Sequence, residues 1–194
     1  MGSILNLFSA FGLSSAAGLN AYLPLLIVGL ITRYTDLWQL QAPYDVLASP
    51  VMLIVLAVLA AVDFLADKIP VVDHIAHAVG AIVHPVAGAV LFASQSNVLS
   101  NVHPIVAMVA GVTVAGGLHA GRAAIRPVAT ATTGGIGNPV LSFMEDVTSF
   151  VLSVLAIFIP LLAFALFLGL LLVMLTSWRR LRRRRAGARS MALW

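Results

Sequence analysis

The stretch GLSSAAGLNAYLP, residues 12–24, interrupts the first apolar segment of the chain. It places serine, glycine, asparagine and proline where a membrane-spanning helix usually carries leucine and valine. Irregular backbone at membrane depth is tolerated only where it is buried in protein or lines a water-filled cavity. The stretch therefore predicts a broken first helix, with short apolar segments at 4–13 and 21–32 on either side of the break.

The composition of the whole chain indicates a membrane protein. Of its 194 residues, 61% are hydrophobic and 9% are charged, whereas a soluble domain carries about 25% charged residues. The apolar runs approach the length that crosses about 30 Å of hydrocarbon, and they cover residues 4–31, 50–66, 75–93, 102–121 and 147–176. We therefore expect an all-α integral membrane protein, a polytopic helix bundle with about four full spans plus two broken or re-entrant helices. The bundle would form a single transmembrane domain over residues 1–178.

The basic residues are concentrated in the tail over residues 179–194. Seven of the eleven lysines and arginines lie in the run WRRLRRRRAGAR that begins at Trp178. Because positive residues beside a span stay in the cytoplasm, the tail predicts a multi-pass protein of the inner (plasma) membrane with a cytoplasmic C-terminus. Membrane lipids are the expected partner of this tail, and nucleic acid is not. The chain has no cysteine, which excludes disulfides and thiolate metal sites.

A second stretch, ATATTGGIGNPV at residues 129–140, repeats the pattern of the first. Residues 14–20, SSAAGLN, align with residues 132–138, TTGGIGN, and both end in an asparagine six positions after the first hydroxyl residue. Inverted repeats with paired, interrupted helices are common in transporters, where the half-helix ends meet near the bilayer midplane. We therefore predict two repeat halves, 1–95 and 102–178. The alternative is that the small residues only allow helices to pack closely.

Two re-entrant breaks would bring their polar side chains into one site. Asn20 and Asn138 are expected to cap the helices that follow them, and Pro139 suits a first helical position. Two helix N-termini that point into one cavity would attract an anion. The residues predicted to bind substrate are Ser14, Ser15, Asn20, Thr132, Thr133, Asn138, Arg122 and Arg126.

Acidic residues within the apolar segments are functional candidates, because a charge is costly to bury in a membrane. Asp63 and Asp67 lie four residues apart, so they share a helix face on which like charges repel. One of the two can keep a proton or bind a cation. The residues predicted to couple protons or ions are Asp63, Asp67, Glu145, Asp146 and His119.

Histidines form a stripe along the apolar segment over 73–93. At 100° per residue, His74, His77 and His84 fall on one helix face. Asp73, His74 and His77 could hold a divalent metal, since carboxylate and imidazole suit zinc or iron. A role in helix packing or proton relay is the stronger interpretation for His77 and His84. No other cofactor is predicted.

His119, Arg122 and Arg126 follow the spacing i, i+3, i+7 and form one face of the helix that leads into the second break. Arginine stays charged in proteins, so both arginines need partners. One interpretation is a set of structural salt bridges to Glu145 and Asp146. The other is that the arginines bind a phosphate or carboxylate group bidentately.

Four segments together resemble one known family. They are SAAGLNAYLPLL (15–26), VDFLADKIPVVDH (62–74), HPVAGAVL (84–91) and ATTGGIGNPVLSFMEDV (131–147). The chain resembles domain-of-unknown-function family 4126, uncharacterised small bacterial integral membrane proteins, over most of its length before the arginine tail. The resemblance implies an integral membrane protein and carries no catalytic residue over to this chain.

The leading functional hypothesis is a small transporter or channel-like protein. It would bind an anionic or phosphate-bearing substrate, free or lipid-linked, between the two re-entrant breaks. The chain encloses little volume by itself, so a homodimer is compatible with this hypothesis. One alternative is a non-catalytic membrane scaffold or assembly factor. A metal-dependent intramembrane enzyme is the less expected alternative.

Overall fold

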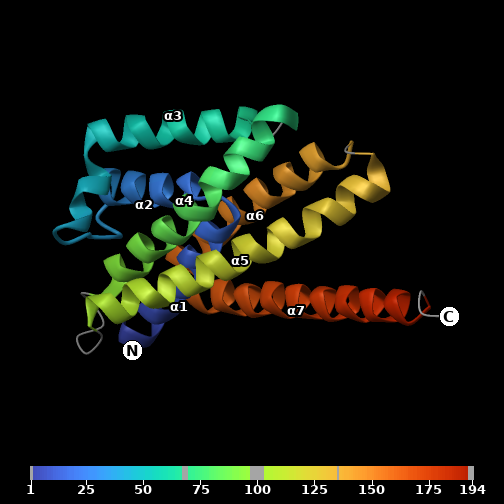
Figure 1. The fold of residues 1–194 in the computed structure, drawn as a ribbon. Helices are drawn as coiled ribbons and strands as arrows, with labels where there is room; N and C mark the ends of the chain where they lie inside the picture. The colour runs from blue at the N-terminus through green and yellow to red at the C-terminus, as the bar shows by residue number, and fades with distance from the viewer. Residues whose placement is uncertain (1, 67–69, 97–102, 135, 192–194) are drawn as a thin grey trace.

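The computed structural model describes residues 2–66, 70–96, 103–134 and 136–191. In these ranges the chain forms seven α-helices and one short 3-10 helix, η1. Figure 1 shows their arrangement. The bounds are α1 Gly2–Leu19, α2 Tyr22–Tyr34, η1 Tyr44–Ala48, α3 Pro50–Ala66, α4 Pro70–Ser96, α5 Pro104–Thr133, α6 Asn138–Phe158 and α7 Pro160–Met191. The described part of the chain is therefore all-α, as the composition predicted.

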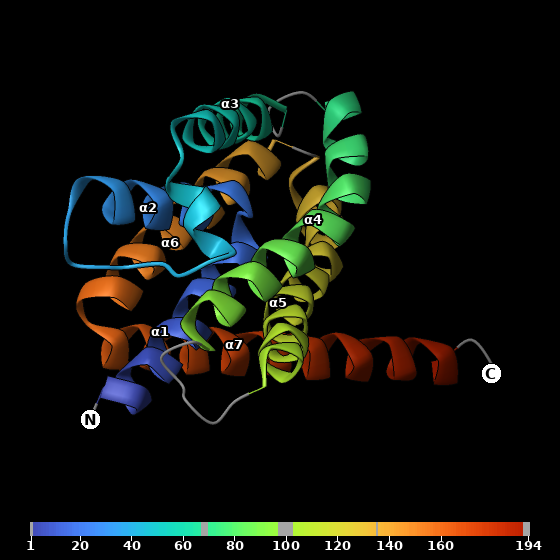
Figure 2. The ribbon, with the colours of Figure 1, turned by 90° about the vertical axis from the view of Figure 1, so that its left-hand side faces the viewer.

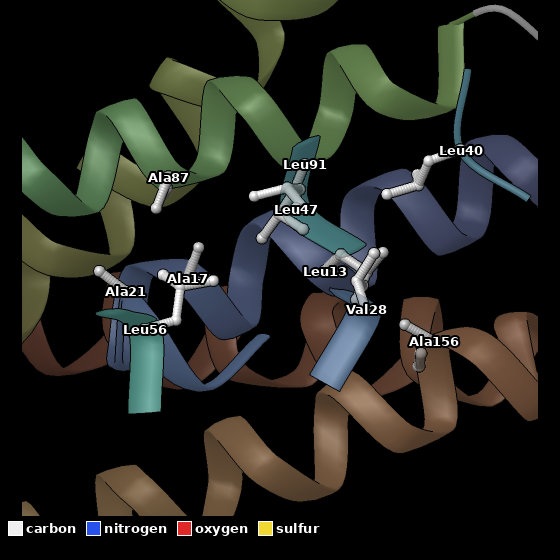
Figure 3. Packing of buried hydrophobic residues seen from close by; sticks show 12 residues of the cluster. Leu13, Ala17, Ala21, Val28, Leu40, Leu47, Leu56, Ala87, Leu91 and Ala156 are labelled. Atoms are coloured by element: carbon white, nitrogen blue, oxygen red, sulfur yellow. The ribbon is translucent and has the colours of Figure 1, made fainter. Parts of the chain in front are cut away.

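Helix α1 is the central element of the bundle. It packs against α4, α5, α6 and α7, which surround it (Figures 1 and 2). Its inner residues Leu13 and Ala17 belong to a buried cluster with Leu91 of α4 and Ala156 of α6 (Figure 3). Small side chains let the neighbouring backbones approach: a Cβ added to Gly18 would lie 2.7 Å from the carbonyl oxygen of Ala115. The small residues of the opening stretch therefore serve close helix packing.

Helices α2 and α3, with η1 between them, form a layer beside this centre. α2 packs on α3, η1 and α6. Leu40 and Leu47, in the segment between α2 and α3, are buried and extend the same apolar cluster. Arg33 at the end of α2 donates a hydrogen bond to the carbonyl oxygen of Ala48 at 3.1 Å. These contacts hold the hairpin of α2 and α3 against the bundle.

The outer surface of the described helices is apolar, as a lipid environment requires. Three helices are long and apolar enough to cross a membrane by length and composition: Pro104–Thr133, Asn138–Phe158 and Pro160–Ser177. The shorter apolar helices cover Ile4–Leu19, Tyr22–Tyr34, Pro50–Ala66 and Ala78–Ser94. On α3, Val51 and Ile54 are 73% and 66% exposed. These features fit a multi-pass membrane protein.

The first helix break is shorter than the sequence predicted. α1 continues through residues 14–19, and only Asn20 and Ala21 separate it from α2. The two serines do not disturb the helix, because their hydroxyl groups bind carbonyl oxygens. Ser15 Oγ donates to Phe11 in the preceding turn, and Ser14 Oγ donates to Gly88 of α4 at 2.9 Å. The expected irregular backbone at residues 14–19 is therefore wrong.

The second break is also shorter, and the last apolar segment is divided. α5 runs to Thr133, where Gly134 adopts a left-handed conformation with φ 62° and ends the helix. A proline at the start of α6 fits the prediction for Pro139. The sequence showed one apolar run over residues 147–176, but α6 ends at Phe158 and α7 begins at Pro160. Proline lacks the N–H that would continue the helix and disfavours helical backbone at Ile159, so the chain turns there.

Candidate functional site

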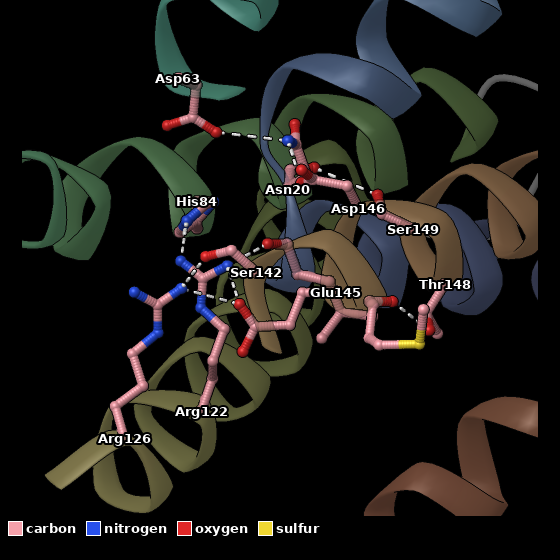
Figure 4. Close-up of polar contacts among 12 residues, drawn as sticks. Asn20, Asp63, His84, Arg122, Arg126, Ser142, Glu145, Asp146, Thr148 and Ser149 are labelled. Atoms are coloured by element: carbon pink, nitrogen blue, oxygen red, sulfur yellow. Dashed lines mark hydrogen bonds and ion pairs between the residues drawn. The ribbon is translucent and has the colours of Figure 1, made fainter. Parts of the chain in front are cut away.

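Asn20 is the residue that organises the junction between α1 and α2. It is 2% exposed. Its Oδ1 accepts hydrogen bonds from the backbone N–H groups of Tyr22 and Leu23, each at 3.0 Å, which confirms its predicted role as a cap of α2. Its Nδ2 donates to Asp146 Oδ1 at 2.9 Å and to Asp63 Oδ2 at 3.2 Å (Figure 4). One buried side chain therefore joins α2, α3 and α6.

Asp63 and Asp146 meet at this junction from different helices. Asp63 lies near the end of α3, and Asp146 lies in the first half of α6. Because both carboxylates contact the same amide nitrogen, they lie close to each other. Two negative charges repel each other strongly in a region of low dielectric constant. The junction therefore brings two acidic side chains from different helices to one buried amide.

Arg122 and Arg126 form a second polar cluster, one helical turn apart on α5. Arg126 Nη2 lies 2.9 Å from Glu145 Oε2, and Arg122 Nη1 lies 3.3 Å from the same oxygen. Ser142 Oγ accepts a further hydrogen bond from Arg126 at 2.7 Å. The Glu145 side chain is 10% exposed, so these ion pairs are largely shielded. The structure therefore has the salt bridges to Glu145 that one interpretation of the arginines predicted.

Arg122 also contacts the end of α1 and a histidine of α4. Its guanidinium donates to the carbonyl oxygen of Leu19, and its Nη2 lies 3.1 Å from His84 Nε2. The last carbonyl groups of a helix carry partial negative charge, which the arginine stabilises. Because arginine only donates hydrogen bonds, His84 Nε2 can act only as the acceptor in this contact. The ring of His119 lies 4.4 Å from that of His84, between centroids.

A pocket of about 410 Å³ opens beside the Asn20 junction. It lies between α2, α3 and α6, and most of its walls are apolar. The residues that line it are Asn20, Leu23, Ala60, Ala61, Phe64, Asp146, Val147 and Phe150. Of these, only Asp146 is charged and only Asn20 adds a second polar side chain. The pocket is thus an open, largely apolar hollow that adjoins the buried polar network.

The other residues predicted to bind substrate lie elsewhere. Ser14 and Ser15 are buried within α1. Their hydroxyl groups donate to the carbonyl oxygens of Gly88 and Phe11, neither of which belongs to the second break. Thr132 and Thr133 are exposed at the end of α5, and the hydroxyl group of Thr132 binds the carbonyl oxygen of Val128 in its own helix. The hydroxyl residues of the two stretches therefore occupy different surroundings.

Asn138 does not cap α6, contrary to expectation. Its Nδ2 donates to Thr130 Oγ1 at 3.0 Å, and the residue at the cap position is Gly137, which has no side chain to offer. The physical reason is that the amide is engaged elsewhere, because Asn138 Oδ1 also lies 3.3 Å from Thr130 Oγ1, in the last turn of α5. Asn138 thus links the end of α5 to the start of α6.

Part of the predicted set lies outside the described residues. Asp67 belongs to it, and so do the side chains of Asp73, His74 and His77, whose backbone lies in α4. Within the ranges that the structure describes, no group of three or more histidine or acidic residues could hold a metal ion. The metal hypothesis for Asp73, His74 and His77 stays a prediction.

Sequence reasoning missed the apolar walls of the pocket and the contact of Ser149 with α1. Phe64 and Phe150 look like any lipid-facing aromatic residue in a membrane helix, so no pattern distinguishes them. Ser149 is different, because a buried polar residue inside an apolar helix is a recognisable signal. Its hydroxyl group donates to the carbonyl oxygen of Ala16 at 2.9 Å and fixes α6 against α1.

Comparison with known proteins gives one result that covers nearly the whole bundle. The chain matches no curated protein and no solved structure. Residues 7–180 match the family described as a domain of unknown function (DUF4126). The match includes the Asn20 junction, the arginine cluster and the pocket. The chain belongs to the DUF4126 family.

Proposed function

We propose that this chain is a small membrane transport protein that binds its substrate in the pocket beside Asn20 and Asp146. The observation that carries the proposal is the meeting of an open apolar pocket with a buried polar network at a helix junction. Transporters bind their substrates at such interruptions, where polar groups become available inside an apolar bundle. A purely structural junction has no need of an adjoining cavity.

The dimensions and chemistry of the pocket support a small organic substrate. Small-molecule sites typically enclose about 300–1,000 Å³, with apolar walls and a few placed polar groups. The pocket, at about 410 Å³, lies in this range, and Asn20 and Asp146 supply its polar groups. Its walls come from three helices, so a shift of the α2–α3 hairpin against α6 would change its access.

The arginines stand apart from this pocket. Arg122 and Arg126 share the carboxylate of Glu145, and neither lines the pocket. An anionic or phosphate-bearing substrate on the arginines would have to displace Glu145. The anionic substrate therefore stays a prediction from the sequence, and the proposal assigns the arginines to holding the site together.

The finer topology belongs to the same proposal. The arginine-rich end of the chain favours a cytoplasmic C-terminus in an inner (plasma) membrane, because positive residues beside a span resist translocation. The halves 1–95 and 102–178 would then be inverted repeats with re-entrant character at the two junctions. Cysteine labelling of positions 37 and 136 from each side of the membrane tests this orientation.

A membrane scaffold is the second candidate, and a specific observation favours it. The contacts of Arg122 and Arg126 join α1, α4, α5 and α6 through polar bonds that are buried or partly buried. Removing one partner of a buried ion pair costs about 3–5 kcal/mol, so this network rigidifies the bundle. A rigid, inert bundle would suit a scaffold that offers its outer faces to partner helices.

Two alanines of α3 provide the test of transport against scaffold. Ala61 lines the pocket, whereas Ala57, one turn earlier and also exposed, does not. We would reconstitute the full chain and the variants Ala61→Leu and Ala57→Leu in proteoliposomes. Uptake of a panel of radiolabelled amines, carboxylates and phosphate monoesters would be measured against empty liposomes.

The proposal expects uptake of at least one class by the wild type. Ala61→Leu fills the pocket and should reduce that uptake at least tenfold, while Ala57→Leu should leave it within twofold. Uptake equal to that of empty liposomes for every class would overturn the proposal and leave the scaffold as the better function. Equal loss in both variants would also contradict it, because the pocket would then not be the site.

A further inference from the structure

We infer that the pocket takes a hydrocarbon chain of a membrane lipid, which enters sideways from the bilayer. This inference rests on the proposed function and names the substrate class of the same site, an amphiphile that is recognised by its chain. Three features support it: the hydrogen bonds of Asn20, the apolar walls of the pocket and the surface on which the pocket opens.

The neutral polar side chain of the pocket, Asn20, has its hydrogen bonds satisfied within the protein. Its Oδ1 accepts from the backbone N–H groups of Tyr22 and Leu23, each at 3.0 Å. Its Nδ2 donates to Asp146 at 2.9 Å and to Asp63 at 3.2 Å (Figure 4). A side-chain amide has two donor hydrogens and two acceptor lone pairs, so these four contacts use its full capacity. Asp146, the other polar residue of the lining, is itself one of the four partners.

The remaining walls of the pocket are apolar. α3 contributes the small side chains of Ala60 and Ala61 here, whereas residues 51–56 of the same helix are all larger apolar residues. Phe64 and Phe150 add two aromatic rings. Such walls give a water molecule too few hydrogen-bond partners, and an empty hollow loses the van der Waals contacts of its lining. A hollow of about 410 Å³ with these walls therefore favours an apolar occupant.

The pocket opens on the outer apolar surface of the bundle. Among its lining residues, Phe64 is 38% exposed, Val147 41% and Phe150 51%. Exposed apolar side chains continue beyond the pocket on both helices, at Leu65 of α3 and at Val151 of α6. The hollow is therefore continuous with the surface that faces the lipid chains of a bilayer.

The position of the pocket along α3 matches a chain whose head group stays at the membrane interface. Ala60, Ala61 and Phe64 lie in the last two turns of α3, which ends at Ala66. At 1.5 Å per residue, Ala60 is about 9 Å from that end along the helix axis. A lipid whose head group lies beside the end of α3 therefore has the upper part of its chain at the level of the pocket. The pocket then contacts the chain and not the head group.

The extent of the pocket favours a lipid chain over a partner helix. Its lining runs from Ala60 to Phe64 on α3 and from Asp146 to Phe150 on α6, about 6 Å along each axis. Packed helices interdigitate whole rows of side chains along their length, which so short a hollow does not allow. Lipid chains are as apolar as the walls, so a chain is held by its contacts with the fixed lining rather than by transfer out of water.

Photolabelling from within the bilayer tests the inference. The full chain would be placed in phosphatidylcholine nanodiscs that contain a small share of phosphatidylcholine with a diazirine in the upper half of one acyl chain. After irradiation, mass spectrometry would quantify the labelled peptides. Residues 51–55, near the other end of α3, are the reference, because Val51 and Ile54 are more exposed than Phe64. Ordinary boundary lipid would label the reference more strongly, whereas we expect Phe64 and Phe150 to be labelled at least threefold more than the reference.

A pair of matched variants locates the label. Ala61→Leu fills the pocket and should lower the labelling of Phe64 and Phe150 at least threefold, while the reference stays within twofold. Ala57→Leu, outside the pocket on the same helix, should change neither. Phosphatidylglycerol with the same diazirine chain should give the same ratio of pocket to reference within twofold, because the chain is what binds. Wild-type labelling of the pocket no stronger than that of the reference, or an equal response to both variants, would overturn the inference.

Two further measurements separate the lipid chain from other occupants. A diazirine-bearing octanol that labels the pocket where the lipid does not would assign it to a small apolar solute. If neither probe is enriched and Ala61→Leu lowers the oligomeric state measured in nanodiscs, the pocket is a contact with a second copy of the chain. Either result would overturn the inference.

The labelling and the uptake assay fail independently of each other. Enriched lipid labelling without uptake that depends on Ala61 would refute the proposed function and leave the lipid site standing. Uptake that depends on Ala61 without enriched labelling would refute the lipid chain and leave the proposed function standing. If both are absent, both proposals fail. Should Ala61→Leu fail to fold, the wild-type ratio of pocket to reference labelling still decides the inference.

Discussion

The two helix junctions of this protein share a sequence pattern but differ in structure. The α1–α2 junction consists of Asn20 and Ala21, both buried in the centre of the bundle. The α5–α6 connection lies at the surface, where Ile136 is 83% exposed and Gly134 makes a left-handed turn. A similar run of small and polar residues therefore supports a buried polar node in one place and an exposed turn in the other.

The difference comes from what surrounds each asparagine. Asn20 has carboxylates from two other helices within hydrogen-bond distance, so its amide links distant parts of the chain. Asn138 contacts Thr130, eight residues away in its own connection. The function of such a residue thus follows from burial and from its partners, which a local pattern does not contain. Four predictions test this difference between the two junctions.

The largest effect is expected at Glu145, because its partner Arg122 also binds the end of α1 next to the buried junction. Glu145→Ala leaves Arg122 and Arg126 without their shared carboxylate in a shielded environment. We expect the free energy of unfolding to fall by about 3–5 kcal/mol, as for other broken buried ion pairs. Reversible unfolding in mixed micelles measures it, with Thr148→Val on the same helix as the control. A loss below about 1 kcal/mol would show that the ion pairs are solvated and weak.

The asparagines give the direct comparison of the two junctions. Asn20→Ala removes a helix cap and two hydrogen bonds to carboxylates, so it should destabilise the protein by about 2–4 kcal/mol. Asn138→Ala removes one partly exposed contact to Thr130 and should cost less than about 1 kcal/mol. The same unfolding titration measures both. Equal losses would mean that the two junctions are energetically alike despite their different burial.

Glycines next to the junctions extend the comparison to backbone packing. A Cβ at Gly18 would meet the Ala115 carbonyl oxygen at 2.7 Å and Leu118 Cβ at 2.8 Å, so Gly18→Ala should cost about 1–3 kcal/mol through overpacking. Gly134 has open space around it, and Gly134→Ala meets only the strain of φ 62°, about 1 kcal/mol. Thermal denaturation of both variants in the same lipid compares them. A larger loss at Gly134 would place the critical packing at the second junction.

The sequence predicted the class of fold because membrane burial imposes a strong compositional signal. The apolar runs anticipated most of the helices, but the run over residues 147–176 is divided at Pro160 into α6 and α7. The extent of the breaks was overestimated. Serine and glycine weaken a helix in water, but in this bundle Ser14 finds a carbonyl partner on α4 and Gly18 lets α5 approach.

The candidate site was predictable only where its partners are close in sequence. Arg126 and Glu145 lie 19 residues apart across one connection, so their pairing could be suggested from opposite charges. Asn20 lies 43 residues from Asp63 and 126 from Asp146, and their meeting depends on the packing of three helices. The apolar walls of the pocket could not be predicted for another reason. Residues such as Phe150 are equally suited to face lipid or to line a pocket, and the sequence does not distinguish these two positions.

The smallest effect is expected from the hydroxyl groups that made the two stretches look alike. Ser14→Ala removes a buried hydrogen bond to the Gly88 carbonyl oxygen and should cost about 1 kcal/mol. Thr132→Ala removes an exposed bond within the last turn of α5 and should change stability by less than about 0.5 kcal/mol, since alanine also favours the helix. Unfolding titrations on the two variants resolve this difference. If Thr132→Ala proved the more damaging, the exposed connection would hold contacts that matter more than its surface position suggests, and the two junctions would be closer in role than their burial indicates.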